Sequence, residues 1–222
     1  MESIGRRRCV GRSLFPLRHS SPAARRTAVP LSLLTQLVTP RLVMRPATFD
    51  DAAAHYQAAR ESMSEVGRWL SWCHSEMTLE ESELWIKTCI DAWRNEEFYG
   101  FYLFDRDGGH FVGCCTINEI DRFRRRANLG YWIRTSRQGR GIATEAVPII
   151  ARFGFRELGL ERLEIVAAVG NLPSQRVAAK VGAQREGTAR NRLRVHGVQH
   201  DAVIFSLIPS DLADGTPAAA RS

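Results

Sequence analysis

The sequence contains, between a predicted strand and a predicted helix, the stretch QGRGIA at residues 138–143. The strand ends near Ile133, and the helix continues to about Leu158. The two glycines let the backbone turn tightly and approach a ligand closely. The first N–H groups of a helix have no partner inside it, and the helix dipole favours an anion at that end. The stretch is therefore predicted to bind a pyrophosphate.

Three kinds of phosphate-binding loop compete for this stretch. A Walker loop needs a lysine directly after its last glycine, and here Ile142 follows Gly141. A Rossmann fingerprint needs a third glycine, where Thr144 stands, and belongs to the first strand–helix unit of a domain rather than to a late one. A loop for the pyrophosphate of coenzyme A meets neither objection. A plain glycine-rich turn is the default for an isolated match.

Strand and helix signals alternate on both sides of this stretch. Thr48 with Asp51 and Thr78 with Glu81 form capping boxes that predict two helix starts. Helices are predicted at 48–62, from residue 78, at 141–158 and at 173–181; strands are predicted at 42–45, 99–104, 111–120, 128–133 and 163–169, with two more flanking His196-Gly197. This order predicts one α/β domain built on a mixed sheet.

The formal net charge of +7 comes almost entirely from the first 38 residues, whose seven arginines and one acid contribute +6. Their Arg-, Ser-, Pro- and Ala-rich composition predicts a disordered basic leader, and it fits equally an organelle transit peptide or a start assigned too far upstream. The remaining chain is nearly neutral, so its charge does not indicate nucleic-acid binding. We expect the domain to cover residues 39–212 and a disordered tail to cover 213–222.

The five cysteines and six histidines follow no metal-binding pattern. No pair of cysteines has zinc-ligand spacing, and no His-Glu-x-x-His motif is present, so no metal is expected. No apolar run approaches the roughly 20 residues that span a bilayer, so no membrane segment is expected. Reduced cysteines favour a reducing compartment, and we therefore expect a cytoplasmic protein.

The glycine-rich stretch is accompanied by further matches to a known family. The sequence resembles the GCN5-related N-acetyltransferase (GNAT) superfamily, and within it the RimJ/RimL type, the ribosomal-protein N-terminal acetyltransferases. The resemblance rests on LGYWI at 129–133, on QGRGIATEA at 138–146, and on Asn171, Ser174, Lys180 and Gly182, which match the N-x-x-S…K-x-G pattern of the superfamily. It covers roughly residues 39–212.

The resemblance implies a fold and a coenzyme. The fold is a single domain with a mixed, mostly antiparallel sheet, splayed between two parallel central strands, with helices on both faces. Acetyl-CoA is implied as the co-substrate, with its pantetheine between strands 128–133 and 163–169 and a backbone N–H near Ile133 polarising the thioester carbonyl. The coenzyme-binding residues that it implies are Trp132, Ile133, Arg134, Gln138, Gly139, Arg140, Gly141, Ile142, Ala143, Thr144, Asn171 and Ser174.

The resemblance also implies catalytic residues. Attack of an amine on a thioester needs a base for the proton of the ammonium and an acid for the leaving thiolate. In the RimL type a Glu before the loop and a Ser after the Asn take these roles; by alignment Asp121 takes the Glu position, with Glu119 as the nearby alternative, and Ser174 takes the Ser position. Asn171 is expected to orient the coenzyme or a water. The alternative roles are ion pairing of Asp121 with adjacent arginines and helix capping by Ser174.

The implied function is transfer of an acetyl group from acetyl-CoA to a primary amine, such as the N-terminal α-amine of a ribosomal or other protein. Asn128 stands where the RimJ/RimL type usually has Glu, so no carboxylate acts at that position. A small-molecule acceptor, such as an antibiotic or a polyamine, and a non-catalytic acyl-CoA-binding module remain as alternatives. We expect a monomer or homodimer.

Overall fold

The computed structural model describes residues 31–212. Its strands are β1 (Leu37–Val38), β2 (Leu42–Pro46), β3 (Tyr99–Asp105), β4 (Phe111–Asp121), β5 (Arg126–Ile133), β6 (Arg162–Ala168), β7 (Gln184–Val195) and β8 (Val198–Leu207). Its α-helices are α1 (Ala52–Glu61), α2 (Leu79–Arg94), α3 (Ile142–Arg156) and α4 (Leu172–Lys180), and its 3-10 helices are η1 (Phe49–Asp51), η2 (Thr135–Arg137) and η3 (Pro209–Leu212). Every helix and strand predicted from the sequence is present, and the two-residue β1 is an addition.

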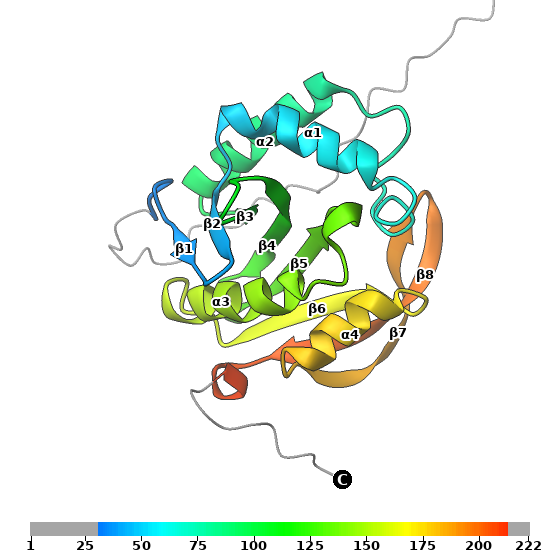
Figure 1. The fold of residues 1–222 in the computed structure, drawn as a ribbon. Helices are drawn as coiled ribbons and strands as arrows, with labels where there is room; N and C mark the ends of the chain where they lie inside the picture. Colours follow the sequence, from blue (N-terminus) through cyan, green and yellow to red (C-terminus); the bar gives the residue numbers. More distant parts are fainter. Residues whose placement is uncertain (1–30, 213–222) are drawn as a thin grey trace, which may run out of the picture.

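The strands form one mixed sheet in the order β1-β2-β3-β4-β5-β6-β8-β7 (Figure 1). Only the central neighbours β5 and β6 run parallel, and all other neighbours are antiparallel. A parallel pair needs a crossover connection, and α3 supplies it here between β5 and β6. The expected fold class is therefore confirmed, including the parallel pair at the centre of the sheet.

Helices cover both faces of this sheet (Figure 1). On β5, Leu129 and Ile133 face a core shared with α3, which contributes Ala146, Ile150 and Phe153. The alternate side chains of the central strands face α1 and α2, where a second cluster contains Ala58, Ile86, Ile90, Tyr102 and Cys114. This division follows from the two-residue period of a strand, because successive side chains point to opposite faces.

Both predicted capping boxes are present in the structure. At the start of α2, Glu81 N donates to Thr78 Oγ1 (3.2 Å), and Thr78 N donates to Glu81 Oε2 (3.0 Å). Thr48 and Asp51 make the same reciprocal arrangement, although it opens η1 and α1 follows directly. These bonds satisfy N–H groups at the helix start that have no partner inside the helix, and they fix where each helix begins.

Part of the predicted leader packs on the domain. Leu37 and Val38 form β1 beside β2, and Trp93 Nε1 donates to the carbonyl of Leu31 (3.0 Å). Leu31 and Leu33 contact the core. The folded unit therefore begins before residue 39. The rest of the predicted leader and the predicted tail lie outside the described residues.

No helix within residues 31–212 is long and apolar enough to cross a membrane. In the same range, no group of three or more His, Cys, Asp or Glu side chains is arranged to hold a metal ion. The four cysteines of this range are free and buried, and burial raises the pKa of the Cys73 thiol to about 11.

Candidate functional site: the gap between the central strands

The site begins where the two parallel strands separate. β5 and β6 are paired only at Arg126↔Arg162, Ala127↔Leu163 and Asn128↔Glu164. From Leu129 onward, β5 remains paired with β4 but not with β6, which continues along β8 as far as Ala168. The sheet is therefore open between β5 and β6, with Asn128 at the vertex of the opening.

The open edge of β5 carries backbone groups that lack a strand partner. Arg134 N donates to the carbonyl of Val112 on β4 (3.0 Å). Because the N–H and C=O groups of successive residues point to opposite edges of a strand, those of Tyr131 and Ile133 face the gap beyond the last pairing with β6. Such an edge can pair with another extended chain that carries amides.

The glycine-rich loop lies at the wide end of this gap. Gly139 and Gly141 have φ angles of 73° and 76°, in the left-handed region, and Gly141 is the N-cap of α3. Glycine adopts this conformation without the steric cost that a Cβ atom would add. The N–H groups of residues 142–144 lie before the first intrahelical bond, in which Glu145 N donates to the carbonyl of Gly141 (3.0 Å). Three N–H donors therefore point out of the helix toward the loop.

Arg41 holds the loop from the β2 side. Its Nη1 donates to the carbonyl of Arg140 (2.9 Å), and its Nε donates to Glu145 Oε2 (2.6 Å). Thr39 Oγ1 also donates to Glu145 (2.5 Å), so Glu145 is neutralised and held away from the loop. The side chain of Arg140 itself is exposed and has no hydrogen-bonded or ion-paired partner within residues 31–212. It is therefore a cation available to a phosphate.

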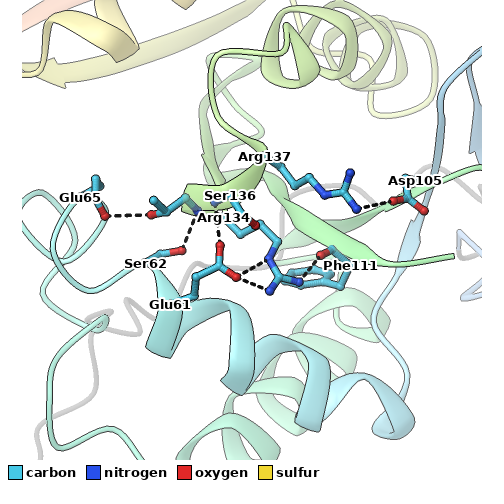
Figure 2. Close-up of polar contacts among 9 residues, drawn as sticks. Glu61, Ser62, Glu65, Asp105, Phe111, Arg134, Ser136 and Arg137 are labelled. Atoms are coloured by element: carbon cyan, nitrogen blue, oxygen red, sulfur yellow. Dashed lines mark hydrogen bonds and ion pairs between the residues drawn. The ribbon is translucent and has the colours of Figure 1, made fainter. Parts of the chain in front are cut away.

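The C-terminal end of α1 holds the loop from the other side (Figure 2). The carboxylate of Glu61 accepts from Arg134 Nε (3.0 Å) and Nη2 at Oε2, and from Ser136 N (2.7 Å) at Oε1. Thr135 N donates to Ser62 Oγ (3.0 Å), and Thr135 Oγ1 donates to Glu65 Oε2 (2.9 Å).

These contacts also determine the charge state of Glu61. The hydrogen bonds from the Arg134 guanidinium are the main reason that the pKa of Glu61 falls to about 2, with Ser136 adding to them. The carboxylate therefore stays ionised at every ordinary pH. Its main partner Arg134 also donates from Nη1 to the carbonyl of Phe111 (3.2 Å).

The predicted coenzyme residues divide into two groups. Residues 138–141 are exposed at the loop, while Ile142 and Ala143 are buried and leave only their backbone N–H groups toward it. Ile133 is core, and Gln138 Nε2 donates to its carbonyl (2.9 Å), which ties the loop to the end of β5. Thr144 lies in the first turn of α3.

The structure places two predicted coenzyme residues in other contacts. The Trp132 ring belongs to an aromatic cluster on the α1–α2 face, with its centroid 5.2 Å from that of Trp72 and 5.8 Å from that of His55. The Arg134 guanidinium donates to Glu61 and to a backbone carbonyl. Arg134 therefore acts on the loop through Glu61 rather than as a free cation for a phosphate.

Ser174 and Asn171 lie on the opposite side of the gap, at the start of α4. Ser174 N donates to Asn171 Oδ1 (3.2 Å), so Asn171 rather than Ser174 is the helix cap. Ser174 Oγ donates to Tyr131 Oη (3.1 Å), and Tyr131 Oη donates to the carbonyl of Ser174 (2.8 Å). This hydroxyl pair bridges β5 and α4 beside the gap.

Tyr131 is a site residue that the sequence did not predict. Burial raises the pKa of its hydroxyl to about 12, so this group keeps its proton at neutral pH. The tyrosine lies inside the LGYWI string, and strand alternation alone places its ring on the face opposite Trp132. That alternation is the signal that could have identified it.

Asp121 lies outside the gap. It pairs with Arg126 at the far end of β5, two residues, or about 7 Å along the strand, before Asn128. Arg124 N (2.9 Å) and Arg124 Nη1 (3.0 Å) donate to its carboxylate, and these bonds lower the pKa of Asp121. The position of Asp121 and its lowered pKa both argue against its acting as the base. Its contacts are those of the alternative role, ion pairing with adjacent arginines.

Glu119 lies closer to the vertex of the gap. The register of β4 against β5 is broken between Asn118 and Asp121, and Glu119 within this break has a φ of 51°. Its Oε2 is 3.8 Å from Arg192 Nη2 on β7. Beside it, Asn128 Nδ2 donates to Asn118 Oδ1 (2.9 Å), and Glu164, the register partner of Asn128 on β6, is ion-paired with Arg162 (3.2 Å).

The contact between Glu119 and Arg192 shows that β7 bends over the sheet. β4 and β7 are four strand positions apart, about 19 Å at the usual spacing. The β7–β8 register breaks between Ala189 and Leu193, which allows this bend.

The turn after β7 extends the cover to the α1–α2 loop. His196 N donates to Ser71 Oγ (2.8 Å), and His196 Nε2 lies 2.6 Å from the carbonyl of Gly67. The α1–α2 loop and the β7–β8 hairpin therefore together cover the face of the gap opposite α3 and α4.

This arrangement can be compared with known proteins. The sequence model of the family described as "Acetyltransferase (GNAT) domain" matches residues 41–184. The chain belongs to the GNAT acetyltransferase family. It is an N-acetyltransferase of the GNAT fold, as the sequence resemblance implied, and the open pair β5–β6 with its loop is the feature that the resemblance predicted.

Similar GNAT proteins include ribosomal-protein acetyltransferases. YdaF of Bacillus subtilis, provisionally named a ribosomal N-acetyltransferase, is 30% identical over 181 residues, which are 79% of this chain and 96% of YdaF. A structure from Vibrio cholerae, provisionally described as a ribosomal-protein-serine acetyltransferase, is 37% identical, with a TM-score of 0.72 over 81% of this chain and 100% of that one. Mycobacterium smegmatis RimJ, solved in complex with CoA-disulfide, is 27% identical, with a TM-score of 0.69 over 78% of this chain and 84% of RimJ.

Proposed function

We propose that this GNAT protein transfers the acetyl group of acetyl-CoA to the N-terminal α-amine of a protein. The observation that carries the proposal is the open edge of β5, which leads directly to the exposed donors at the start of α3. The RimJ complex with CoA-disulfide supports the choice of coenzyme. The ribosomal-protein names of the similar proteins support a protein acceptor.

The residues at the gap fit coenzyme A as a binding partner. The N–H groups of residues 142–144 and the free guanidinium of Arg140 suit the pyrophosphate, because both are donors without a protein partner at the exposed loop. The backbone groups of Tyr131 and the N–H of Ile133 suit the amides of the pantetheine arm. The coenzyme supplies the acetyl thioester at the narrow end of the gap.

Proton transfer is assigned to groups on opposite faces of the sheet. Glu119, whose exposed carboxylate lies 3.8 Å from Arg192 Nη2, accepts the proton that the acceptor ammonium loses as its nitrogen bonds to the acetyl carbon. The hydroxyl pair of Ser174 and Tyr131, on the α4 face, donates to the thiolate as the carbon–sulfur bond breaks. The products are an acetylated amine and coenzyme A with a free thiol.

The covered face favours an extended acceptor. The α1–α2 loop and the β7–β8 hairpin are joined at His196, on the face of the gap opposite α3 and α4. We expect a free chain terminus to reach the gap past these two loops more readily than a lysine on a folded surface. This geometry is the reason for preferring an N-terminal amine over a lysine within a folded protein.

The test mixes the purified full chain with acetyl-CoA and three amines, followed by mass spectrometry. The amines are peptides with a free α-amine, the same peptides blocked at the N-terminus but containing lysine, and spermidine. Acetylation of the free α-amine only is the expected result. Acetylation of spermidine alone would replace the proposed acceptor with a small molecule, and binding of acetyl-CoA without any transfer would identify a non-catalytic acyl-CoA-binding module.

A further inference from the structure

Polar contacts with the end of α1 hold the segment that precedes the coenzyme loop, residues 138–141. η2 has no buried residue, and a Cβ atom at Gly139 would meet no atom within 4 Å, so packing does not fix the position of the loop. Its position depends on polar contacts instead. Five hydrogen bonds from residues 134–136 reach three side chains at the end of α1, namely Glu61, Ser62 and Glu65 (Figure 2).

The charge of Glu61 makes this contact unusual. A carboxylate near a pyrophosphate site opposes anion binding through Coulomb repulsion. It also occupies the Arg134 guanidinium, which would otherwise be free to attract the phosphates. The unfavourable charge of Glu61 is therefore offset by another effect, namely the hydrogen bonds by which its carboxylate holds the segment before the loop. Oε1 holds Ser136 N while Oε2 holds Arg134, so one side chain fixes both ends of a short segment before the loop.

The same residue joins the coenzyme side of the protein to the acceptor side. Glu61 ends α1, and the α1–α2 loop begins at Ser62. That loop carries Trp72, whose ring contacts Trp132 on β5, and Ser71, which accepts from His196 N. The end of α1 therefore contacts the segment before the coenzyme loop and is continuous with the loop that covers the acceptor face.

We infer that Glu61 is a positioning residue that holds the coenzyme loop in its binding conformation and links it to the cover over the acceptor face. The inference rests on the proposed function, because it concerns the affinity for coenzyme A. Two explanations predict opposite results when the Glu61 carboxylate is removed. If its charge alone matters, coenzyme A should bind more tightly, because a repulsive charge is lost. If it positions the loop, coenzyme A should bind more weakly.

The experiment titrates coenzyme A by calorimetry into the full chain and its variants. Glu61→Gln should weaken binding about tenfold, because a charge-assisted contact is lost on the segment that orients the loop. Glu61→Asp keeps the charge but shortens the side chain, so it should also weaken binding, whereas a charge effect would leave it unchanged.

Glu186→Gln is the matched control. Glu186 accepts from Arg162 Nη1 (2.6 Å) and Nη2 (2.5 Å) and from Ser206 Oγ (2.7 Å), and these contacts, those from Arg162 above all, lower its pKa to about 2, as for Glu61. It lies on β7, near the paired end of the gap and far along the strands from the loop. Its loss should lower thermal stability as much as Glu61→Gln does and leave coenzyme A affinity within about twofold of wild type.

The outcomes for Glu61 and for wild type separate the inference from the proposed function. Binding by folded Glu61→Gln or Glu61→Asp that is as tight as wild type, or tighter, overturns the inference while the proposed function stands. Absence of binding by wild type removes the proposed function and this inference with it. If neither Glu61 variant folds, Thr135→Val removes only the hydroxyl that donates to Glu65, and it should weaken binding at least about twofold; unchanged affinity would overturn the inference.

Discussion

At the scale of single residues, the choice of base depends on where two nearby carboxylates lie. Asp121 is held by Arg124 and Arg126 at the paired end of β5. Glu119 sits in the register break, closer to the vertex and facing the bent segment of β7. Alignment placed Asp121 at the base position, with Glu119 as the alternative, because a bulge of this kind shifts which residue faces the site and no composition signal marks it.

Glu119→Gln should therefore lower kcat by about 100-fold at neutral pH, the usual cost of losing a general base. The loss should shrink as pH rises, because the amine then deprotonates without help. The measurement is the pH–rate profile with an acetylated peptide as product. Asp121→Asn should have a kcat close to that of wild type. Arg192→Gln removes the ion pair with Glu119 but keeps the base, so it shows how much of the effect of Glu119→Gln comes from loss of the ion pair. Equal effects of Glu119→Gln and Asp121→Asn would contradict the assignment.

At the scale of elements, the sequence predicted the order of strands and helices and the place of the loop. Capping boxes and glycines are local signals, and the bonds that they predict at Thr78 and Gly141 are made within a few residues. The contacts around the loop are not local. Glu61 precedes Arg134 by 73 residues, and no spacing pattern connects them, so this contact beside the loop could not be found from the sequence.

Gly141 tests how far backbone conformation at the start of α3 determines coenzyme binding. Its φ of 76° lies in the left-handed region, and an added Cβ would approach only Arg41 Nη2, at 3.6 Å. Gly141→Ala therefore adds backbone strain of about 1–2 kcal/mol without a clash. If the loop relaxes to avoid this strain, coenzyme A affinity should fall by up to about tenfold, as calorimetry can measure.

Gly187→Ala is the control for that substitution. Gly187 has no left-handed φ, and its added Cβ would meet nothing within 4 Å. Its coenzyme A affinity should match that of wild type. A Gly141→Ala protein that binds as well as the Gly187→Ala protein would show that the conformation of the loop is not what coenzyme A recognises.

At the scale of the whole molecule, the burial of His55 in the aromatic cluster of the α1–α2 face makes the stability of the fold depend on pH. It is 2% exposed, lies among the rings of Trp72, Tyr102, Phe111 and Trp132, and makes a contact of 3.1 Å with Ser82 Oγ. Burial lowers the pKa of His55 to about 4 from 6.5. The unfolded chain therefore binds this proton more readily than the folded protein does.

The folded protein should accordingly lose stability as pH falls from 6.5 to 4, by about 3 kcal/mol from this group alone. Above pH 6.5 the contribution of His55 is constant, because the imidazole is neutral in both states. Chemical denaturation at several pH values measures the slope. His55→Asn keeps a polar partner for Ser82 and removes the titration, so it should flatten the slope between pH 4 and 6.5, even if it lowers stability at every pH. If the stability of His55→Asn fell with pH as steeply as that of wild type, the pH dependence would not come from His55.

The central claim is that coenzyme A binds along the open edge of β5 with its phosphates at the start of α3. The most direct test is the backbone amide NMR spectrum of the full chain, recorded while coenzyme A is added. The largest shifts should fall on the N–H groups of Tyr131 and Ile133 and of residues 142–144. Shifts centred elsewhere, or saturation of binding without change at these five amides, would contradict the claim.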